Sequence, residues 1–195
     1  MIRDSSRREM PGISSDRIRR SRDTEESTAS TFAMRDWRAT ARSDIMTTMT
    51  LDPTLRIDAA RFWSTVMRSG EIGRGKAGGL RRLALTDADK EMRDLFVAWC
   101  TETGCTVAVD RVGNIFARRP GTDDHLAPVL IGSHLDTQMA GGKYDGIVGV
   151  LAGLEILRTL DERRIRTRRP LELVCWTNEE GARFTPPMVA SGAFS

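Results

Sequence analysis

The chain has 195 residues, enough for one domain of ordinary size with a buried core. Its 30 basic and 27 acidic residues leave a net charge of +3, and no basic stripe with interleaved aromatic residues occurs, which argues against a nucleic-acid-binding protein. Hydrophobic residues make up 39% of the chain, but no apolar run approaches the length of a membrane-spanning helix, so we expect no membrane contact.

The three cysteines, Cys100, Cys105 and Cys175, are odd in number and lack the Cys-x-x-Cys spacing of a metal or redox motif. They lie in or beside apolar patterns, so we expect buried thiols and no disulfide framework. This cysteine usage is typical of a reducing compartment, and we expect a cytoplasmic protein.

Residues 1–48 differ in composition from the rest of the chain, with abundant Arg, Ser and Thr and few large apolar side chains. This composition predicts a disordered N-terminal extension, followed by a folded part in residues 49–195. The segment lacks the apolar stretch of a secretory signal, and its scattered acidic residues argue against a transit peptide. Methionines at Met34, Met46 and Met49 leave the natural start of the protein open.

Two amphipathic helices are predicted before the first strand. The first follows Ile57, with Asp58 as its N-cap, and stops at Gly70; the second opens with a capping-box pattern at Thr86 and ends before Gly104. The Gly-rich basic segment 70–82 between them loosely resembles a phosphate-binding loop. It has neither the Gly-Lys-Ser/Thr signature nor a preceding strand, so we do not expect phosphate there.

The remaining pattern predicts a hairpin followed by a strand–helix–strand unit. Segments 105–110 and 115–118 form the hairpin, and the continuous apolar run 129–131 predicts a strand covered on both faces. A largely buried helix begins after Gly146, with Val148, Ala152 and Ile156 widening its apolar stripe, and residues 171–176 form the next strand. Because such crossovers are right-handed, the two strands are expected to be parallel and neighbouring.

Metal-ligand side chains follow both of these strands. His134, Asp136 and Asp145 follow the first strand, and Glu179 and Glu180 follow the second. Imidazole and carboxylate groups suit a divalent transition ion, and Asp136 is spaced to orient His134. Each group alone also fits a hydrogen-bonded loop or a solvated turn. Their shared place at strand ends, where open α/β sheets bind ligands, favours a metal site.

Four motifs, in order, resemble one known family. They are HLDTQ at 134–138, GGKYDG at 141–146, GVLAGLEILRTL at 149–160 and WTNEEGARF at 176–184. These motifs are similar to those of zinc-dependent amidohydrolases of the hydantoinase/carbamoylase type, which are relatives of the M20-like aminopeptidases and carboxypeptidases. Within this family they most resemble N-carbamoyl-amino-acid and N-carbamoyl-β-alanine hydrolases (ureidopropionases), with allantoate amidohydrolases close by.

The resemblance, which covers about residues 55–195, implies an α/β fold. It is the dinuclear-zinc aminopeptidase-like catalytic domain, with a mixed, mainly parallel sheet between helices. It also implies that His134 binds one ion, Glu180 the other and Asp145 both, while Glu179 is the general base and Asp136 supports His134. The two divalent ions would be zinc first, with manganese, cobalt or nickel as alternatives. They would activate water for hydrolysis of a linear ureido C–N bond, not a peptide bond.

Further expectations that follow from the resemblance concern the substrate and the partners. Gln138 and Arg183 border the motifs and are candidate substrate contacts, although either could equally be structural. The expected substrate is a small carbamoyl amino acid. The family pattern also implies a homodimer formed through an inserted lid domain.

The sequence also departs from the family pattern. That pattern needs two further histidine ligands and the lid, whereas His125 and His134 are the only histidines, and His125 is expected on the surface. We therefore expect a truncated catalytic domain that is inactive alone. One alternative is a non-catalytic fragment or remnant with weak metal binding; another is an allantoate amidohydrolase or a related aminopeptidase or deacylase.

Overall fold

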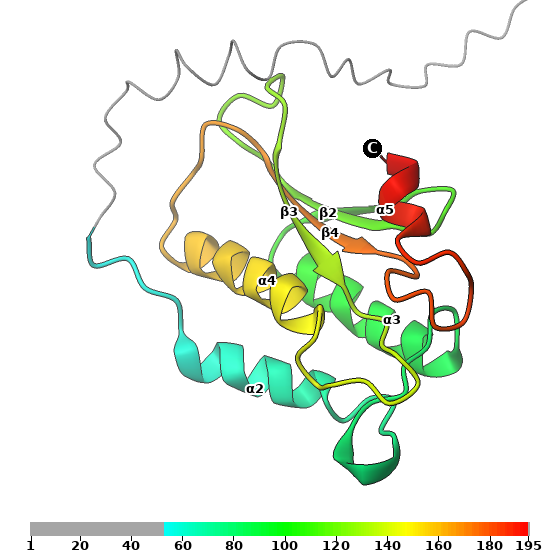
Figure 1. Ribbon diagram of the computed structural model, residues 1–195. Helices are drawn as coiled ribbons and strands as arrows, with labels where there is room; N and C mark the ends of the chain where they lie inside the picture. Colours follow the sequence, from blue (N-terminus) through cyan, green and yellow to red (C-terminus); the bar gives the residue numbers. More distant parts are fainter. Residues whose placement is uncertain (1–52, 195) are drawn as a thin grey trace, which may run out of the picture. The chain divides into compact units, whose positions relative to one another are not determined.

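The computed structural model of the protein describes residues 53–194 (Figure 1). The predicted extension over residues 1–48 lies outside the described residues. The helices follow the capping signals of the sequence: Asp58 accepts a hydrogen bond from the Arg61 N–H, and Thr86 accepts one from the Asp89 N–H. The helices are α2 (Ala59–Ser69), the 3-10 turn η2 (Lys76–Gly78), α3 (Asp87–Glu102), α4 (Ile147–Glu162) and α5 (Val189–Phe194).

Four strands form one mixed sheet in the order β1-β2-β4-β3. The strands are β1 (Thr106–Val109), β2 (Ile115–Arg119), β3 (Val129–His134) and β4 (Leu171–Trp176). The predicted hairpin is the antiparallel pair β1–β2, and β4 joins β2 in antiparallel orientation. The predicted crossover is confirmed, because β3 pairs with β4 in parallel from Val129 opposite Leu171 to His134 opposite Trp176.

Helix α4 packs against the sheet, and α2 lies along the other side of α4 (Figure 1). Two glycines allow the close approach: a Cβ atom on Gly153 would lie 2.5 Å from Cδ1 of Leu173, and one on Gly149 would lie 2.8 Å from Cβ of Ser133. The backbone of α4 therefore sits directly on β3 and β4. This packing fixes the start of α4, which immediately follows the loop that carries Asp145.

A buried ion pair joins α2 to α4. Glu155 is almost fully buried and accepts two hydrogen bonds from the Arg61 guanidinium, at 2.7 Å from Nη2 and 3.0 Å from Nε. It also accepts one from the Asp58 backbone N–H at 3.2 Å. A buried charge is tolerated when it is paired and hydrogen-bonded in this way, and the pairing raises the pKa of Arg61.

The expectation that β3 is covered on both faces is wrong. Val129 and Leu130 are 47% and 38% exposed. The reason is that β3 lies at the edge of the sheet, where no strand within residues 53–194 pairs with its outer side. Val148 and Ile156 are also exposed, although both were expected in the buried stripe of α4. The apolar stripe of this helix is wider than the surface that the sheet and α2 together cover.

The cysteine prediction is confirmed: Cys100, Cys105 and Cys175 are free and buried. Burial raises the pKa of the Cys175 thiol to about 12, so this group stays protonated at neutral pH. None of the helices in residues 53–194 is long and apolar enough to cross a lipid bilayer.

We expect the exposed edge strand to promote self-association, since unpaired strands with apolar side chains template pairing between chains. Leu130→Thr introduces a β-branched polar residue that suits a strand, and it should lower the concentration-dependent light scattering of the purified chain. Val112→Thr, which replaces an exposed apolar residue in the turn between β1 and β2, is the matched control. Equal effects of the two substitutions would show that general hydrophobicity, and not the β3 edge, drives association.

Candidate metal centre

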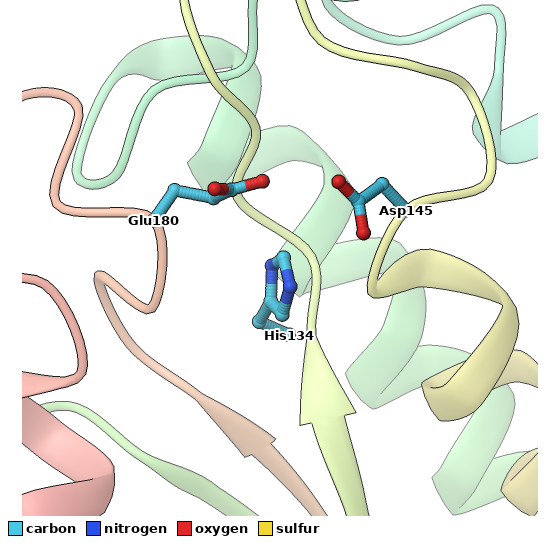
Figure 2. A group of neighbouring side chains, drawn as sticks. All are labelled: His134, Asp145 and Glu180. Carbon is cyan, nitrogen blue, oxygen red and sulfur yellow. The ribbon is translucent and has the colours of Figure 1, made fainter.

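The parallel pair β3–β4 places the two predicted clusters together, beyond the C-terminal ends of the two strands. His134 is the last residue of β3 and lies opposite Trp176, the last residue of β4. The loop after β3 carries Asp145, and the turn after β4 carries Glu180. Figure 2 shows the three side chains turned toward a common centre from these three segments, and their candidate ligand atoms all lie within 4.8 Å of one another.

The donor set of this cluster fits a divalent transition ion. One imidazole nitrogen and two carboxylates are the ligands that zinc binds in hydrolytic sites. His134 is buried, Glu180 is half-buried and Asp145 is exposed, so the centre opens toward solvent on one side. The Nδ1 atom of His134 lies 2.9 Å from the Asp136 backbone carbonyl. With the proton on Nδ1, the imidazole presents the Nε2 lone pair to an ion.

Asp136 links the two clusters through its side chain. Its Oδ1 accepts a hydrogen bond from the Glu179 N–H and its Oδ2 accepts one from the Glu180 N–H, both at 3.2 Å. The carboxylate lies 3.8 Å from His134 Nδ1, so the backbone carbonyl makes the closer contact with the ring. Asp136 therefore orients His134 through its backbone and holds the Glu179-Glu180 turn through its carboxylate.

The turn after β4 is held by further side-chain hydrogen bonds. Asn178 has a φ of 55°, a left-handed conformation that asparagine tolerates, and its Nδ2 donates to the Phe184 carbonyl at 2.8 Å. Glu179 Oε2 accepts a hydrogen bond from Ser191 Oγ at 3.0 Å. Sequence reasoning missed Ser191, because it lies twelve residues beyond Glu179 and belongs to none of the four motifs.

The two candidate substrate contacts lie in different settings. Gln138 is exposed, and its Nε2 donates to Oε2 of Glu180 at 3.0 Å, so it borders the cluster. Arg183 donates from Nη1 to the backbone carbonyls of Ala84, at 2.9 Å, and of Leu85. Its guanidinium also lies over the Phe184 ring, 4.8 Å from the centroid. These contacts join the segment after the Glu turn to the start of α3.

Arg82 is a second residue that the sequence reasoning missed. Its side chain is fully buried, and Nε donates to the carbonyl of Leu135, the residue between His134 and Asp136, at 2.7 Å. Nη1 donates to the carbonyls of Ser69, at 2.9 Å, and Ile72, at 3.1 Å. Burial lowers the Arg82 pKa to about 10, so the side chain stays charged at neutral pH.

The backbone of the same segment pairs with the loop after β3. The Thr137 N–H donates to the Arg82 carbonyl at 2.8 Å, and the Arg82 N–H donates to Thr137 Oγ1 at 2.9 Å. Leu80 and Gly141 exchange two backbone hydrogen bonds of 2.9 Å. The Gly-rich segment 70–82 thus supports the candidate metal loop. The sequence shows a glycine-rich loop that ends in two arginines, and no sequence signal distinguishes the buried Arg82 from the exposed Arg81.

Comparisons with known proteins show which family the chain resembles. The family model described as Peptidase family M28 matches residues 114–194. An N-carbamoyl-L-amino-acid amidohydrolase of Rhizobium meliloti is 54% identical over 140 residues, which cover 72% of this chain and 34% of that protein. The crystal structure of a hydantoinase/carbamoylase family amidase from Burkholderia ambifaria matches with a TM-score of 0.71 and 59% identity, over 72% of this chain and 35% of that one. The chain belongs to the hydantoinase/carbamoylase family of amidohydrolases.

The family is hydrolytic, since its relatives carry amidohydrolase names. A more distant relative is allantoate deiminase 1 of Glycine max, 31% identical over 134 residues, which cover 67% of this chain and 28% of that protein. This chain spans about a third of the length of the curated relatives it matches.

Gly146 provides a test of the cluster geometry. It has a φ of 68°, and a Cβ atom there would lie 2.1 Å from Nε2 of His134. Gly146→Ala should therefore displace the imidazole and weaken zinc binding by about 10-fold or more, measured by isothermal titration calorimetry. Gly142→Ala is the matched control, because a Cβ there meets nothing within 4 Å. Unchanged affinity in Gly146→Ala would contradict the placement of His134.

Arg82 provides a test of the support beneath the loop. Arg82→Met removes the guanidinium donors to three buried backbone carbonyls, of which that of Ser69 keeps the Ile72 N–H at 3.2 Å, so we expect a loss of about 3 kcal/mol or more in the free energy of unfolding. Urea denaturation followed by circular dichroism measures this loss. Arg81→Met, at the exposed neighbour, should change stability little; equal losses would show that the buried guanidinium has no special role.

Proposed function

We propose that this chain forms part of the catalytic centre of a metal-dependent amidohydrolase, which hydrolyses the linear C–N bond of an N-carbamoyl amino acid. The observation that carries the proposal is the convergence of His134, Asp145 and Glu180, whose candidate ligand atoms lie within 4.8 Å of one another beyond the C-terminal ends of two parallel strands. The kinship with proteins named N-carbamoyl-L-amino-acid amidohydrolases supports the substrate class.

In this proposal, His134 and Glu180 would each hold one divalent ion, and Asp145 would contribute to holding both. The mixed nitrogen and oxygen donor set favours zinc, with manganese, cobalt or nickel as alternatives. A divalent ion bound there supplies Lewis-acid polarisation of a carbonyl and acidifies water at neutral pH. Asp136 keeps the His134 ring and the Glu180 backbone at a fixed separation through the hydrogen bonds described above.

Glu179 is our candidate general base. Its Oε2 accepts the Ser191 hydroxyl, while Oε1 accepts no hydrogen bond from residues 53–194. Oε1 can therefore take a proton from a water molecule that attacks the substrate carbonyl carbon. The protonated carboxyl then returns the proton to the departing nitrogen, as a general acid–base residue does.

Substrate binding remains a proposal for two residues. Gln138 is exposed beside Glu180, so its amide is placed to meet a polar group of a bound carbamoyl amino acid. Arg183 uses Nη1 on the Ala84 and Leu85 carbonyls, and a substrate carboxylate would have to use Nε or Nη2. We further propose the family homodimer as the assembly and the cytoplasm as the location, in keeping with the free buried thiols.

Within residues 53–194, three side chains form the candidate ligand set. A catalytic zinc ion commonly has three protein ligands plus water, so two ions need more donors than His134, Asp145 and Glu180 provide. His125, the other histidine, is exposed in the loop before β3 and is not part of the cluster. We propose that this chain alone holds one ion weakly and does not hydrolyse ureido substrates.

The allantoate amidohydrolase alternative has weaker support. The soybean allantoate deiminase is 31% identical to this chain, against 54% for the Rhizobium carbamoylase. N-carbamoyl-β-alanine, an N-carbamoyl-L-amino acid and allantoate, tested side by side on this chain and on a full-length relative, separate these substrate classes.

Metal titration of the purified chain tests the proposal. We expect calorimetry with zinc to show one ion per chain, with Glu180→Gln weakening the affinity by about 10-fold or more because a ligand is lost. Glu179→Gln should leave the affinity nearly unchanged, since Glu179 is not in the ligand cluster. No product should form from the three ureido substrates at any metal concentration.

Two results would overturn parts of this account. An equal loss of zinc affinity in Glu179→Gln and Glu180→Gln would contradict the separate roles of base and ligand. Turnover by the chain alone, abolished by Glu179→Gln, would show that the three ligands suffice for catalysis.

A further inference from the structure

A pocket of about 320 Å³ lies at the opposite end of the sheet from the candidate metal centre. Arg119, in its lining, ends β2 and pairs with Leu171 at the start of β4, whereas the metal cluster follows the other end of β4. The remaining lining comes mainly from the ends of α3 and α4 and from the connection to β4, including Thr103, Gly104, Asp161, Arg164 and Arg166.

Arg119 brings an unpaired donor to this pocket. Its side chain is more than nine-tenths buried, and Nη2 donates to the Ile165 carbonyl at 2.7 Å. Nη1 is buried and has no hydrogen-bond partner among residues 53–194. A buried donor of a charged group without an acceptor costs free energy, so an acceptor supplied by a ligand would stabilise it.

Arg164 occupies a backbone position that normally favours glycine. Helix α4 ends in a Schellman motif: the Arg164 N–H donates to the Asp161 carbonyl and the Ile165 N–H to the Leu160 carbonyl, both at 2.9 Å. Arg164 has a φ of 54° there, a left-handed conformation that is unfavourable for a non-glycine residue. Its guanidinium makes no hydrogen bond or ion pair within the described part of the chain.

Arg166 completes a set of three guanidinium groups. It donates from Nη2 to the Gly121 carbonyl at 2.6 Å, which leaves its other donors free of bonds to residues 53–194. Asp161 is the one carboxylate in the lining, and it forms no ion pair with the three arginines within 4.0 Å in that range. The pocket therefore carries excess positive charge and many uncommitted N–H donors.

Interaction with helix ends explains only part of this arrangement. Both α3 and α4 end at the pocket, and the helix dipole stabilises cations near a helix C-terminus. That gain needs positive charge but no hydrogen-bond acceptor, so it does not account for the unpaired Nη1 of Arg119. Planar guanidinium groups match the geometry of phosphate oxygens, which accept two hydrogen bonds from one arginine.

We propose that this pocket binds a phosphate-type oxyanion, either inorganic phosphate or a phosphate monoester of a small metabolite. Arg119, Arg164 and Arg166 donate hydrogen bonds to its oxygens. The site is separate from the amidohydrolase centre, because it lies at the other end of β4 and uses none of the same residues.

Inorganic phosphate is the probe for the test, used with the full chain in EDTA and with chloride added to hold the ionic strength constant. We expect saturable binding in calorimetry and a thermal midpoint that rises with phosphate concentration, since a ligand of the folded state stabilises it. Glycerol phosphate in a parallel titration distinguishes a monoester from the free ion.

Arg164→Gly is the informative variant, because glycine relieves the backbone conformation while the guanidinium is lost. Without phosphate its thermal midpoint should equal or exceed that of the unchanged chain, yet its phosphate affinity should fall by about tenfold or more. Arg163→Gln removes an exposed neighbouring arginine that does not line the pocket, and it should retain the affinity.

Three outcomes would overturn the proposal. The first is the absence of saturable binding by either probe, which would leave helix-end stabilisation as the role of these arginines. The second is an equal loss of affinity in Arg163→Gln and Arg164→Gly, which would indicate diffuse attraction to a basic surface. The third is full affinity in a folded Arg164→Gly variant.

Discussion

The parallel pairing of β3 with β4 is the constraint on which the candidate site depends. The C-terminal ends of both strands lie side by side, so His134 and Glu180 converge there. These two residues are more than forty positions apart in sequence. A shift of the register by one residue would turn the side chains of a strand to the opposite face. The glycines of α4 set the depth at which that helix packs on the two strands, and hence where the loop with Asp145 begins.

Two charged side chains then fix the loops that follow these strand ends. Asp136 joins the loop after β3 to the Glu179-Glu180 turn, and Arg82 donates a hydrogen bond to the Leu135 carbonyl. Burial disfavours the charged form of Arg82 and lowers its pKa to about 10. The hydrogen bonds to backbone carbonyls and the nearby charges of Asp89 and Asp136 oppose this effect of burial. In our proposal, the negative charge of Asp136 would also moderate the repulsion between the buried guanidinium and a metal ion held by the cluster.

Much of this organisation follows from local patterns in the sequence. The caps at Asp58 and Thr86, the β1–β2 hairpin and the β3–α4–β4 crossover are short-range features with defined signatures, and all were predicted. The convergence of His134, Asp145 and Glu180 followed from the crossover rule, because that rule fixes which strand ends meet. The roles of these residues in catalysis remain predictions.

Other features depend on tertiary contacts that no local pattern records. The exposure of Val129 and Leu130 depends on which strand lies at the sheet edge, and a continuous apolar run cannot show this. The burial of Arg82 depends on carbonyls from two other segments, residues 69–72 and the loop after β3, and the hydrogen bond from Ser191 to Glu179 depends on the return of α5 to the site. Asp136 shows the same limit: its spacing indicated an interaction with His134, whereas its carboxylate accepts from the Glu turn.

The most direct test of the central claim is a crystal structure of the chain grown with zinc, with diffraction data collected at the zinc absorption edge. The account predicts an anomalous-difference peak between His134 Nε2 and the carboxylates of Asp145 and Glu180, at about 2.0–2.2 Å from the ligand atoms. A structure with zinc bound only elsewhere, for example at exposed His125, or with no ordered zinc, would contradict it.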